Sequence, residues 1–209
     1  MYGRPPRIRG LALAAGLILL LGSAGLFLTR YRVYAVPSAS MSPGIEPGDR
    51  IVVDTWSQDA ARGDVVLVDG ETRLVKRVAA IGGDVVACCT ADARVTVGGT
   101  PAAQPPAAGN EPFSVAVAPG RLFLLGDNPG VSADSRAAAV TTDESDGDGT
   151  VAATTVGGRV VAVLAPGERG GLLPDRAGAA LRRTSWGALA GIALLAAAGL
   201  LALLPRRAS

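Results

Sequence analysis

Lys76 is the only lysine in a chain with nineteen arginines and no histidine. A serine or cysteine nucleophile needs a neighbouring group that accepts its proton, and histidine is the usual one. Arginine cannot replace it, because its guanidinium stays protonated at any working pH. Nucleophilic catalysis would therefore depend on Lys76, a carboxylate, a metal-bound hydroxide or the α-amino group. The alternative is a surface lysine that survives by chance in an arginine-rich composition.

The residues around Lys76 predict a β-strand over 73–79, with the sequence RLVKRVA. Because side chains alternate between the two faces of a strand, Leu74, Lys76 and Val78 should share one face. Burial among aliphatic neighbours disfavours the charged amine and lowers its pKa. A base that works near neutral pH needs a fall of roughly three units from about 10.4, worth about 4 kcal/mol. The alternative is a lysine whose stem packs on the sheet while its ammonium reaches water.

Three hydroxyls, those of Ser38, Ser40 and Ser42, lie in the segment 36–49, which reads VPSASMSPGIEPGD and leads into a predicted strand. A spacing of two places Ser38 and Ser40 on the same side of an extended backbone. One could attack a carbonyl while the other donates a hydrogen bond to the resulting oxyanion. A Ser/Pro-rich linker beside a membrane is the alternative.

A polar loop at 126–136, with the sequence GDNPGVSADSR, directly follows another predicted strand. The charges of Asp134 and Arg136 can pair and brace such a loop. A calcium-binding loop is a second interpretation, but the ligand spacing does not match an EF-hand. A plain β-turn is the third.

The region that carries these segments predicts a mainly β fold, because short Val/Ile/Leu runs recur between Gly, Pro and Asp residues. The expected strands are 50–54, 64–68, 73–79, 84–87, 94–97, 121–125 and 159–164. Surface loops are expected at 101–112, which is rich in Pro and Ala, and at 141–155, which is acidic and polar.

Two apolar segments of equal length predict transmembrane helices at 10–28 and 186–204. Each is roughly 28 Å long as a helix, about the thickness of a hydrocarbon core. The first could instead be a cleaved signal peptide, but its apolar core exceeds the usual length and no good small-x-small site directly follows it. A buried helix is the alternative for the second.

Arginines near both ends of the chain favour cytoplasmic tails at 1–9 and 205–209 under the positive-inside rule, although arginines also flank the other end of each span. We therefore expect a two-pass protein of the cell membrane. Its β domain, 29–165, would lie on the extracytoplasmic side and join the second span through a linker at 166–185. With a net charge of +2 and no basic face with interleaved aromatics, nucleic acid is not expected as a partner.

Cys88 and Cys89 are adjacent, and without histidine an ordinary zinc site is not available. The oxidising environment outside the cytoplasm favours paired thiols. A disulfide between the two neighbours, two buried thiols and an intermolecular bridge all stay open, and no metal or cofactor is expected.

Taken together, the three polar segments resemble the type I signal peptidases, membrane-anchored serine proteases with a Ser–Lys dyad. The serine segment of that family, S-x-S-M-x-P-T-L and then G-D, matches 38–45 and 48–49. The lysine segment, V-K-R-V-x-G-x-P-G-D, matches 75–84, and the third, G-D-N-x-x-x-S-x-D-S-R, matches 126–136. The three motifs occur in the family's order.

The resemblance implies that Ser40 is the nucleophile and Lys76 the general base. It also implies that Ser38 adds a hydroxyl to an oxyanion hole beside the Ser40 N–H, and that Ser132 orients the Lys76 amine. Two charged residues of the third motif would hold the loop: Asp134 and Arg136.

The family fold implied by the resemblance is an antiparallel β-sheet or coiled-barrel catalytic domain, flanked in this chain by N- and C-terminal transmembrane helices. The implied substrates are secreted preproteins with signal peptides, cut after a small residue, usually Ala, in an A-x-A site. The lipid bilayer is the second expected partner.

The chain departs from the family pattern at several positions: 44–45 read Gly-Ile in place of Thr-Leu, Gly82 stands in place of a Pro, and Pro129 replaces an Arg. The pattern also dissolves over 137–155. A self-cleaving repressor-type Ser–Lys protease is a rival within the enzymes, but it would need a DNA-binding helical domain. A catalytically inactive, membrane-tethered β module that binds partners is the rival from another class.

Overall fold

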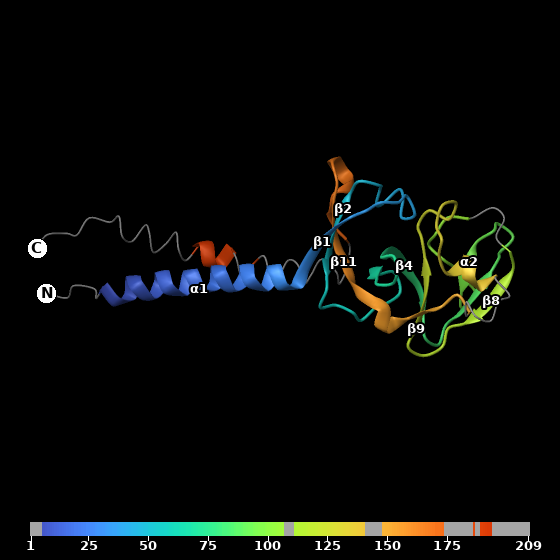
Figure 1. Ribbon diagram of the computed structural model, residues 1–209, viewed down its shortest axis with the longest axis horizontal. Coiled ribbons are helices and arrows are strands. Elements are labelled where there is room, and N and C mark those ends of the chain that lie inside the picture. Colours follow the sequence, from blue (N-terminus) through green and yellow to red (C-terminus); the bar gives the residue numbers. More distant parts are fainter. Residues whose placement is uncertain (1–5, 107–110, 141–147, 174–185, 187–188, 194–209) are drawn as a thin grey trace, which may run out of the picture. The chain divides into compact units, whose positions relative to one another are not determined.

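The computed structural model describes residues 6–106, 111–140, 148–173, 186 and 189–193 (Figure 1). The chain divides into two compact units, one formed by 1–31 with 178–209 and the other by 32–177. All three motifs that could carry chemistry lie in the second unit.

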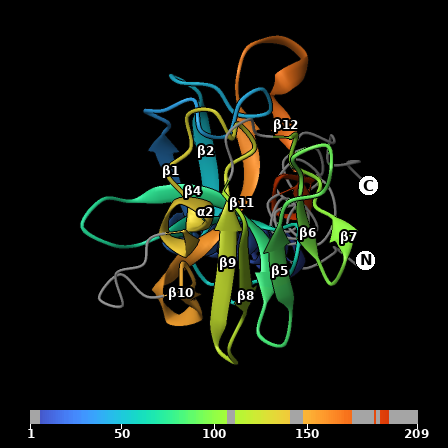
Figure 2. The same ribbon diagram turned by 90° about the vertical axis from the view of Figure 1, so that its right-hand side faces the viewer.

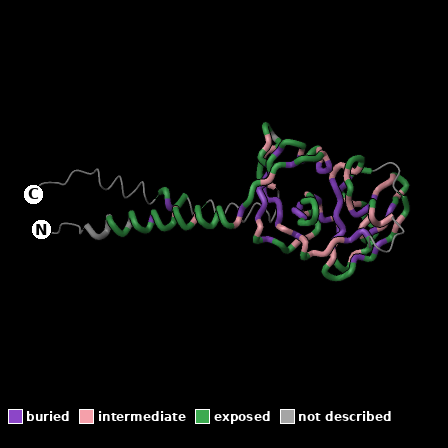
Figure 3. The backbone as a smooth tube through the Cα atoms, viewed as in Figure 1, coloured by how far each residue is buried: buried purple, intermediate pink, exposed green. Residues whose placement is uncertain are grey.

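The long helix of the first unit is α1 (Pro6–Arg30). Its stretch Leu13–Arg30 is long and apolar enough to cross a membrane, and only 6% of that stretch is buried (Figure 3). The first predicted span, 10–28, falls within this helix. Of the second predicted span, 186–204, the structure describes only 186 and 189–193, and the span stays a prediction.

The second unit is built on an eight-stranded sheet with the order β1-β2-β11-β3-β4-β9-β10, in which β12 also pairs with β11 (Figures 1 and 2). The pairs from β2 to β10 are antiparallel. The strands are β1 (Tyr31–Ala35), β2 (Arg50–Asp54), β3 (Val65–Val68), β4 (Leu74–Ile81), β9 (Arg121–Leu125), β10 (Val151–Ala152), β11 (Val156–Leu164) and β12 (Gly171–Leu172).

A smaller antiparallel sheet has the order β7-β6-β5-β8. Its strands are β5 (Val85–Cys88), β6 (Val95–Val97), β7 (Thr100–Pro101) and β8 (Phe113–Ala116). One short helix, α2 (Ser135–Ala139), contacts β8 of this sheet and β9 of the larger one.

Alternating side chains of β3 and β4 separate two of the three apolar cores. Val65 and Leu67 belong to the core that also contains Met41 and Ile45. Val66 and Val78 belong to a core on the other face, together with residues of β9. The third core joins the smaller sheet to β9 through residues such as Val86 and Phe123. Lys76 therefore lies at a position of β4 that faces the second of these cores.

The predicted strands at 50–54 and 121–125 coincide with β2 and β9, and the other five overlap β3, β4, β5, β6 and β11. The short strands β1, β7, β8, β10 and β12 were not predicted. Two of them fall where irregular chain was expected: β10 lies in the 141–155 segment, followed by a 3₁₀ turn at Ala153–Thr155, and β12 lies in the 166–185 segment. These two strands form by pairing with longer strands, and a segment of two residues is too short to show a periodic pattern in the sequence.

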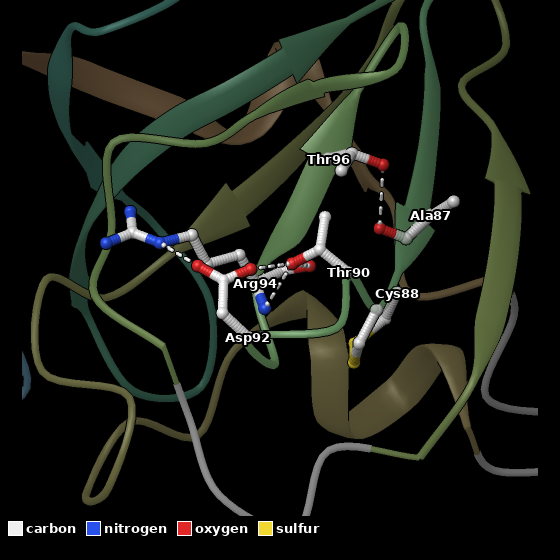
Figure 4. Close-up of a disulfide and its surroundings, with 7 residues drawn as sticks. Ala87, Cys88, Thr90, Asp92, Arg94 and Thr96 are labelled. Atoms are coloured by element: carbon white, nitrogen blue, oxygen red, sulfur yellow. Dashed lines mark hydrogen bonds and ion pairs between the residues drawn. A yellow bond between two sulfur atoms is a disulfide. The ribbon is translucent and has the colours of Figure 1, made fainter.

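Cys88 and Cys89 form a disulfide with each other at the end of β5 (Figure 4). Of the three states left open by the sequence, the structure contains this one. Cys88 is buried in the core shared with Phe123, while Cys89 is exposed. The turn that follows is braced by Asp92, which accepts hydrogen bonds from Thr90 Oγ1 and Arg94 Nε.

Candidate active site

Lys76 is buried, with 4% of its surface exposed. It lies in the half of β4 that pairs with β3, opposite Val66. The expected alternation is present, because Lys76 and Val78 are buried while the residues on either side of them in the strand are only partly buried. Leu74, at the start of the strand, is exposed. The ammonium therefore does not extend into water, and the alternative interpretation of a snorkelling lysine does not hold.

Ser40 lies in a turn between β1 and β2 that apolar residues anchor on both sides. Val36, Met41 and Ile45 are each at most 4% exposed and share one core. The backbone also closes the turn, since Val36 N–H donates to Asp49 O at 2.9 Å and Gly48 N–H donates to Val36 O at 2.9 Å. A hydroxyl placed between such anchors has a defined position.

The two sequence segments meet at their hydroxyl and amine. Lys76 Nζ lies 2.9 Å from Ser40 Oγ, within hydrogen-bonding distance, although the residues are far apart in the chain. Ser38 Oγ donates to Ser40 Oγ at 3.4 Å. Ser42 Oγ instead donates to Glu46 Oε2 at 2.6 Å, so this hydroxyl belongs to the turn and not to the pair.

The loop after β9 carries a buried ion pair. Asp134 caps the N-terminus of α2 and accepts hydrogen bonds from Arg136 Nε at 2.9 Å and Arg136 Nη2 at 2.6 Å. It also accepts one from the Gly126 backbone N–H at 2.9 Å. Burial acts to raise the pKa of Asp134, but these hydrogen bonds outweigh it and the pKa lies below its usual value. The carboxylate therefore stays ionised and holds both ends of the loop together.

The same loop packs directly on the nucleophile segment. Asn128 N–H donates to the Ser40 carbonyl oxygen at 3.0 Å. Gly126 approaches so closely that a Cβ at this position would lie 2.5 Å from the Ser40 carbonyl oxygen and 2.1 Å from Ser132 Oγ. Only a residue without a side chain allows this approach.

Burial is the main cause that lowers the pKa of the Lys76 amine below its usual 10.5. The charge of Asp134 opposes this effect, and the charge of Arg136 adds to it. The environment thus favours the neutral amine, which is the form that can accept a proton.

Ser132, expected to orient the Lys76 amine, is close to the pair but does not hydrogen-bond to it. Its Oγ is buried and near Asp134, without the geometry of a full hydrogen bond to any partner. The role of Ser132 in orienting the Lys76 amine therefore stays a proposal.

A second ion pair beside the site was not anticipated. Arg77 donates to both carboxylate oxygens of Asp127, at 2.8 Å and 2.5 Å, and to Gly63 O at 2.9 Å. This bidentate pair ties the start of the polar loop to the strand of Lys76. The sequence contained a signal for it, since Arg77 and Asp127 are both residues of the family motifs.

The arrangement combines a hydroxyl, a buried amine with a lowered pKa and a second hydroxyl, which are the parts needed for acyl transfer through a serine ester. With intact Ser40 and Lys76 in contact, an inactive binding module is not favoured.

The chain matches the family described as signal peptidase, peptidase S26, over residues 8–165. This match includes all three motifs and most of the described part of the chain.

Two curated relatives are similar over about two thirds of their length. Signal peptidase I of Mycobacterium tuberculosis (strain CDC 1551 / Oshkosh) is 31% identical over 200 residues, covering 68% of this chain and 67% of that protein. A probable signal peptidase I of Mycobacterium leprae (strain TN) is 31% identical over 204 residues, covering 67% of this chain and 70% of that protein.

A crystal structure of a signal peptidase I from Enterococcus faecalis V583 aligns with 49% of this chain and 97% of its own, at 22% identity and a TM-score of 0.36.

Proposed function

The chain belongs to the peptidase S26 family of signal peptidases, and we propose that it cleaves preproteins with Ser40 as the nucleophile and Lys76 as the general base. It is a membrane-bound serine protease that removes signal peptides. The observation that supports this dyad is the 2.9 Å contact between Lys76 Nζ and Ser40 Oγ in a buried setting.

Acylation begins when neutral Lys76 accepts the Ser40 proton and Ser40 Oγ attacks the scissile carbonyl. The bond to the leaving nitrogen then breaks, and the nitrogen takes the proton from the Lys76 ammonium as the mature protein departs. In the second half, Lys76 accepts a proton from water, and the hydroxide attacks the Ser40 ester. Release of the signal peptide returns that proton to Ser40 Oγ, so both residues end as they began.

The negative oxygen formed in each half needs donors fixed before the reaction. The Ser38 hydroxyl, which already lies 3.4 Å from Ser40 Oγ, and the Ser40 backbone N–H are our candidates. Removing one such donor in a serine protease costs about 2.7–4 kcal/mol in transition-state stabilisation. Ser132, Asp134 and Arg136 would support the pair from the polar loop.

Two features near the dyad support binding of an extended signal peptide that ends in a small residue. β9 pairs only with the part of β4 from Arg77 onward, so the segment 74–76 has a strand partner on one side only within the described chain. An added strand could pair along that edge. The apolar side chains of Val36, Met41 and Val75 lie beside it, which suits a short apolar side chain at the cut, such as Ala.

We further propose a two-pass topology. The tails 1–9 and 205–209 would be cytoplasmic, the spans would be 10–28 and 186–204, and the peptidase domain, 29–165, would lie outside with a linker at 166–185. The apolar stretch Leu13–Arg30 supports the first span. A membrane-impermeant maleimide should label Ser114→Cys in intact cells and not Ser209→Cys, and labelling of the latter would contradict the cytoplasmic tail.

The dyad is tested with purified full-length protein in detergent and a preprotein substrate. Ser40→Ala should abolish cleavage, and so should Lys76→Arg, because arginine cannot become neutral. Ser42→Ala is the matched control, since that hydroxyl contacts Glu46 and should be dispensable for chemistry. Cleavage by folded Ser40→Ala or Lys76→Arg protein would refute the proposal.

A further inference from the structure

A cavity of about 330 Å³ opens beside the catalytic lysine on the face of β4 that carries Lys76. Its volume is at the lower end of ligand pockets, which run from about 300 to 1,000 Å³. The lining comes from four parts of the chain: the start of β4, β9, the polar loop with α2, and the turn that leads into β10.

The wall of this cavity consists mainly of small and aliphatic side chains. Leu74, Lys76 and Leu124 line it from β4 and β9, while Ala133, Ala138 and Gly149 border it from the loop, α2 and the turn. Asp134 also borders the cavity, but its carboxylate is fully buried and its oxygens are engaged by Arg136 and Gly126. The site therefore suits an apolar group and not a charged one.

The chemistry of the dyad indicates which part of a substrate comes here. Lys76 must hand its proton to the leaving nitrogen, so that nitrogen lies within hydrogen-bonding reach of Nζ. The nitrogen belongs to the first residue of the mature protein. That residue therefore lies on the Lys76 side of the scissile bond.

Strand geometry leads to the same assignment. Successive side chains of an extended peptide point to opposite faces. If the last residue of the signal peptide faces the core that contains Met41 and Val75, the next residue faces the other side of the sheet. That side carries Lys76 and the cavity.

Resting on the proposed dyad, we propose that this cavity is the subsite for the first residue of the mature protein and that it accepts an aliphatic or aromatic side chain there. Ala133 and Ala138 determine its size. Larger residues at either position would exclude bulky side chains from the subsite while leaving room for glycine.

The test uses full-length protein in detergent and peptides that share one signal sequence but carry Gly, Ala, Leu or Phe as first mature residue. Wild type should cleave the Leu and Phe peptides about as well as the Ala peptide. Ala138→Leu should lower kcat/KM for Leu and Phe on the order of tenfold relative to Gly, the discrimination expected from loss of space in an apolar pocket. Ala133→Leu narrows the same cavity from another element and should act likewise, which covers the case in which one variant does not fold.

Ala118→Leu is the control, because Ala118 is exposed in the turn between β8 and β9 and does not border the cavity. An equal loss for all four peptides in the folded cavity variants would overturn the proposal. A second peptide set varies the next-to-last residue of the signal peptide, whose side chain also points to this face. The proposal would be overturned as well if the cavity variants discriminated among the peptides of this second set and not among those of the first. Neither result would affect the dyad, which fails if folded Ser40→Ala or Lys76→Arg protein retains cleavage.

Discussion

Gly126→Ala should inactivate the enzyme through one methyl group that touches neither the base nor the nucleophilic oxygen. The added Cβ would lie 2.5 Å from the Ser40 carbonyl oxygen, 2.1 Å from Ser132 Oγ and 2.6 Å from Ser132 Cβ. Ser132 can turn its hydroxyl away, but the Ser40 carbonyl is backbone and accepts a hydrogen bond from Asn128 N–H. The loop and the nucleophile segment must therefore separate.

The separation needed can be taken from the contact distances. Ordinary Cβ contacts begin near 3.4 Å, so the Ser40 carbonyl and residue 126 must move apart by about 0.9 Å. A misplacement of about 1 Å at a reacting centre costs on the order of 100-fold in rate. Overpacking of this kind also destabilises a fold by about 1–3 kcal/mol, which leaves a folded protein to measure.

The assay is kcat/KM on a signal-peptide substrate, together with a thermal unfolding curve for each variant. Gly130→Ala is the matched control from the same loop, because its Cβ would meet only Asn128 Oδ1 at 3.8 Å, an ordinary contact. We expect near wild-type activity for Gly130→Ala and about 1% for Gly126→Ala. A folded Gly126→Ala enzyme with more than half of wild-type activity would refute the reasoning, and equal losses in both variants would show that the loop tolerates no change at all.

Three further predictions concern the charge of the amine. Activity should rise with pH as Lys76, whose pKa burial lowers below 10.5, loses its proton, and a flat kcat/KM profile from acid to alkaline pH would contradict this. Lys76→Met should raise the melting temperature, because it removes a buried amine. Between the lowered pKa of Lys76 and 10.5, the unfolded wild type binds more protons than the folded protein, so the stability of the wild type rises with pH. The difference in melting temperature between Lys76→Met and wild type should therefore shrink in that pH range. Arg136→Gln should shift the activity profile to higher pH, because Asp134 would then act on Lys76 without a competing cation; an unchanged profile with intact fold would count against this coupling.

The local features of the site could be predicted from the sequence because they follow from spacing. The alternation around Lys76 indicated its buried face, and the Val/Ile/Leu runs indicated β2 and β9 with their bounds. The contact between Asn128 N–H and the Ser40 carbonyl could not be predicted in this way. It depends on β4 pairing with both β3 and β9, which is a property of the sheet order and not of any one segment.

The close approach between Gly126 and Ser40 could not be predicted from the sequence for a related reason. A glycine after a strand reads as a turn residue, and its φ here is not positive, so conformational freedom does not explain it. The requirement is for space, and space depends on what the rest of the chain places there. The family motif marks the position, while the distance to Ser40 explains why a side chain is excluded.

The polar loop meets two opposed electrostatic requirements of a site with a lysine base. A neutral amine needs burial, yet the loop beside it needs an ionised carboxylate to cap α2 and to bind the Gly126 N–H. Without a neighbouring cation, the charge of Asp134 would raise the pKa of Lys76 and favour its protonated form. Arg136 is 7% exposed and donates two hydrogen bonds to that carboxylate, which offsets its charge at short range. The ion pair thus holds the loop by charge, while Lys76 stays in surroundings that favour its neutral form.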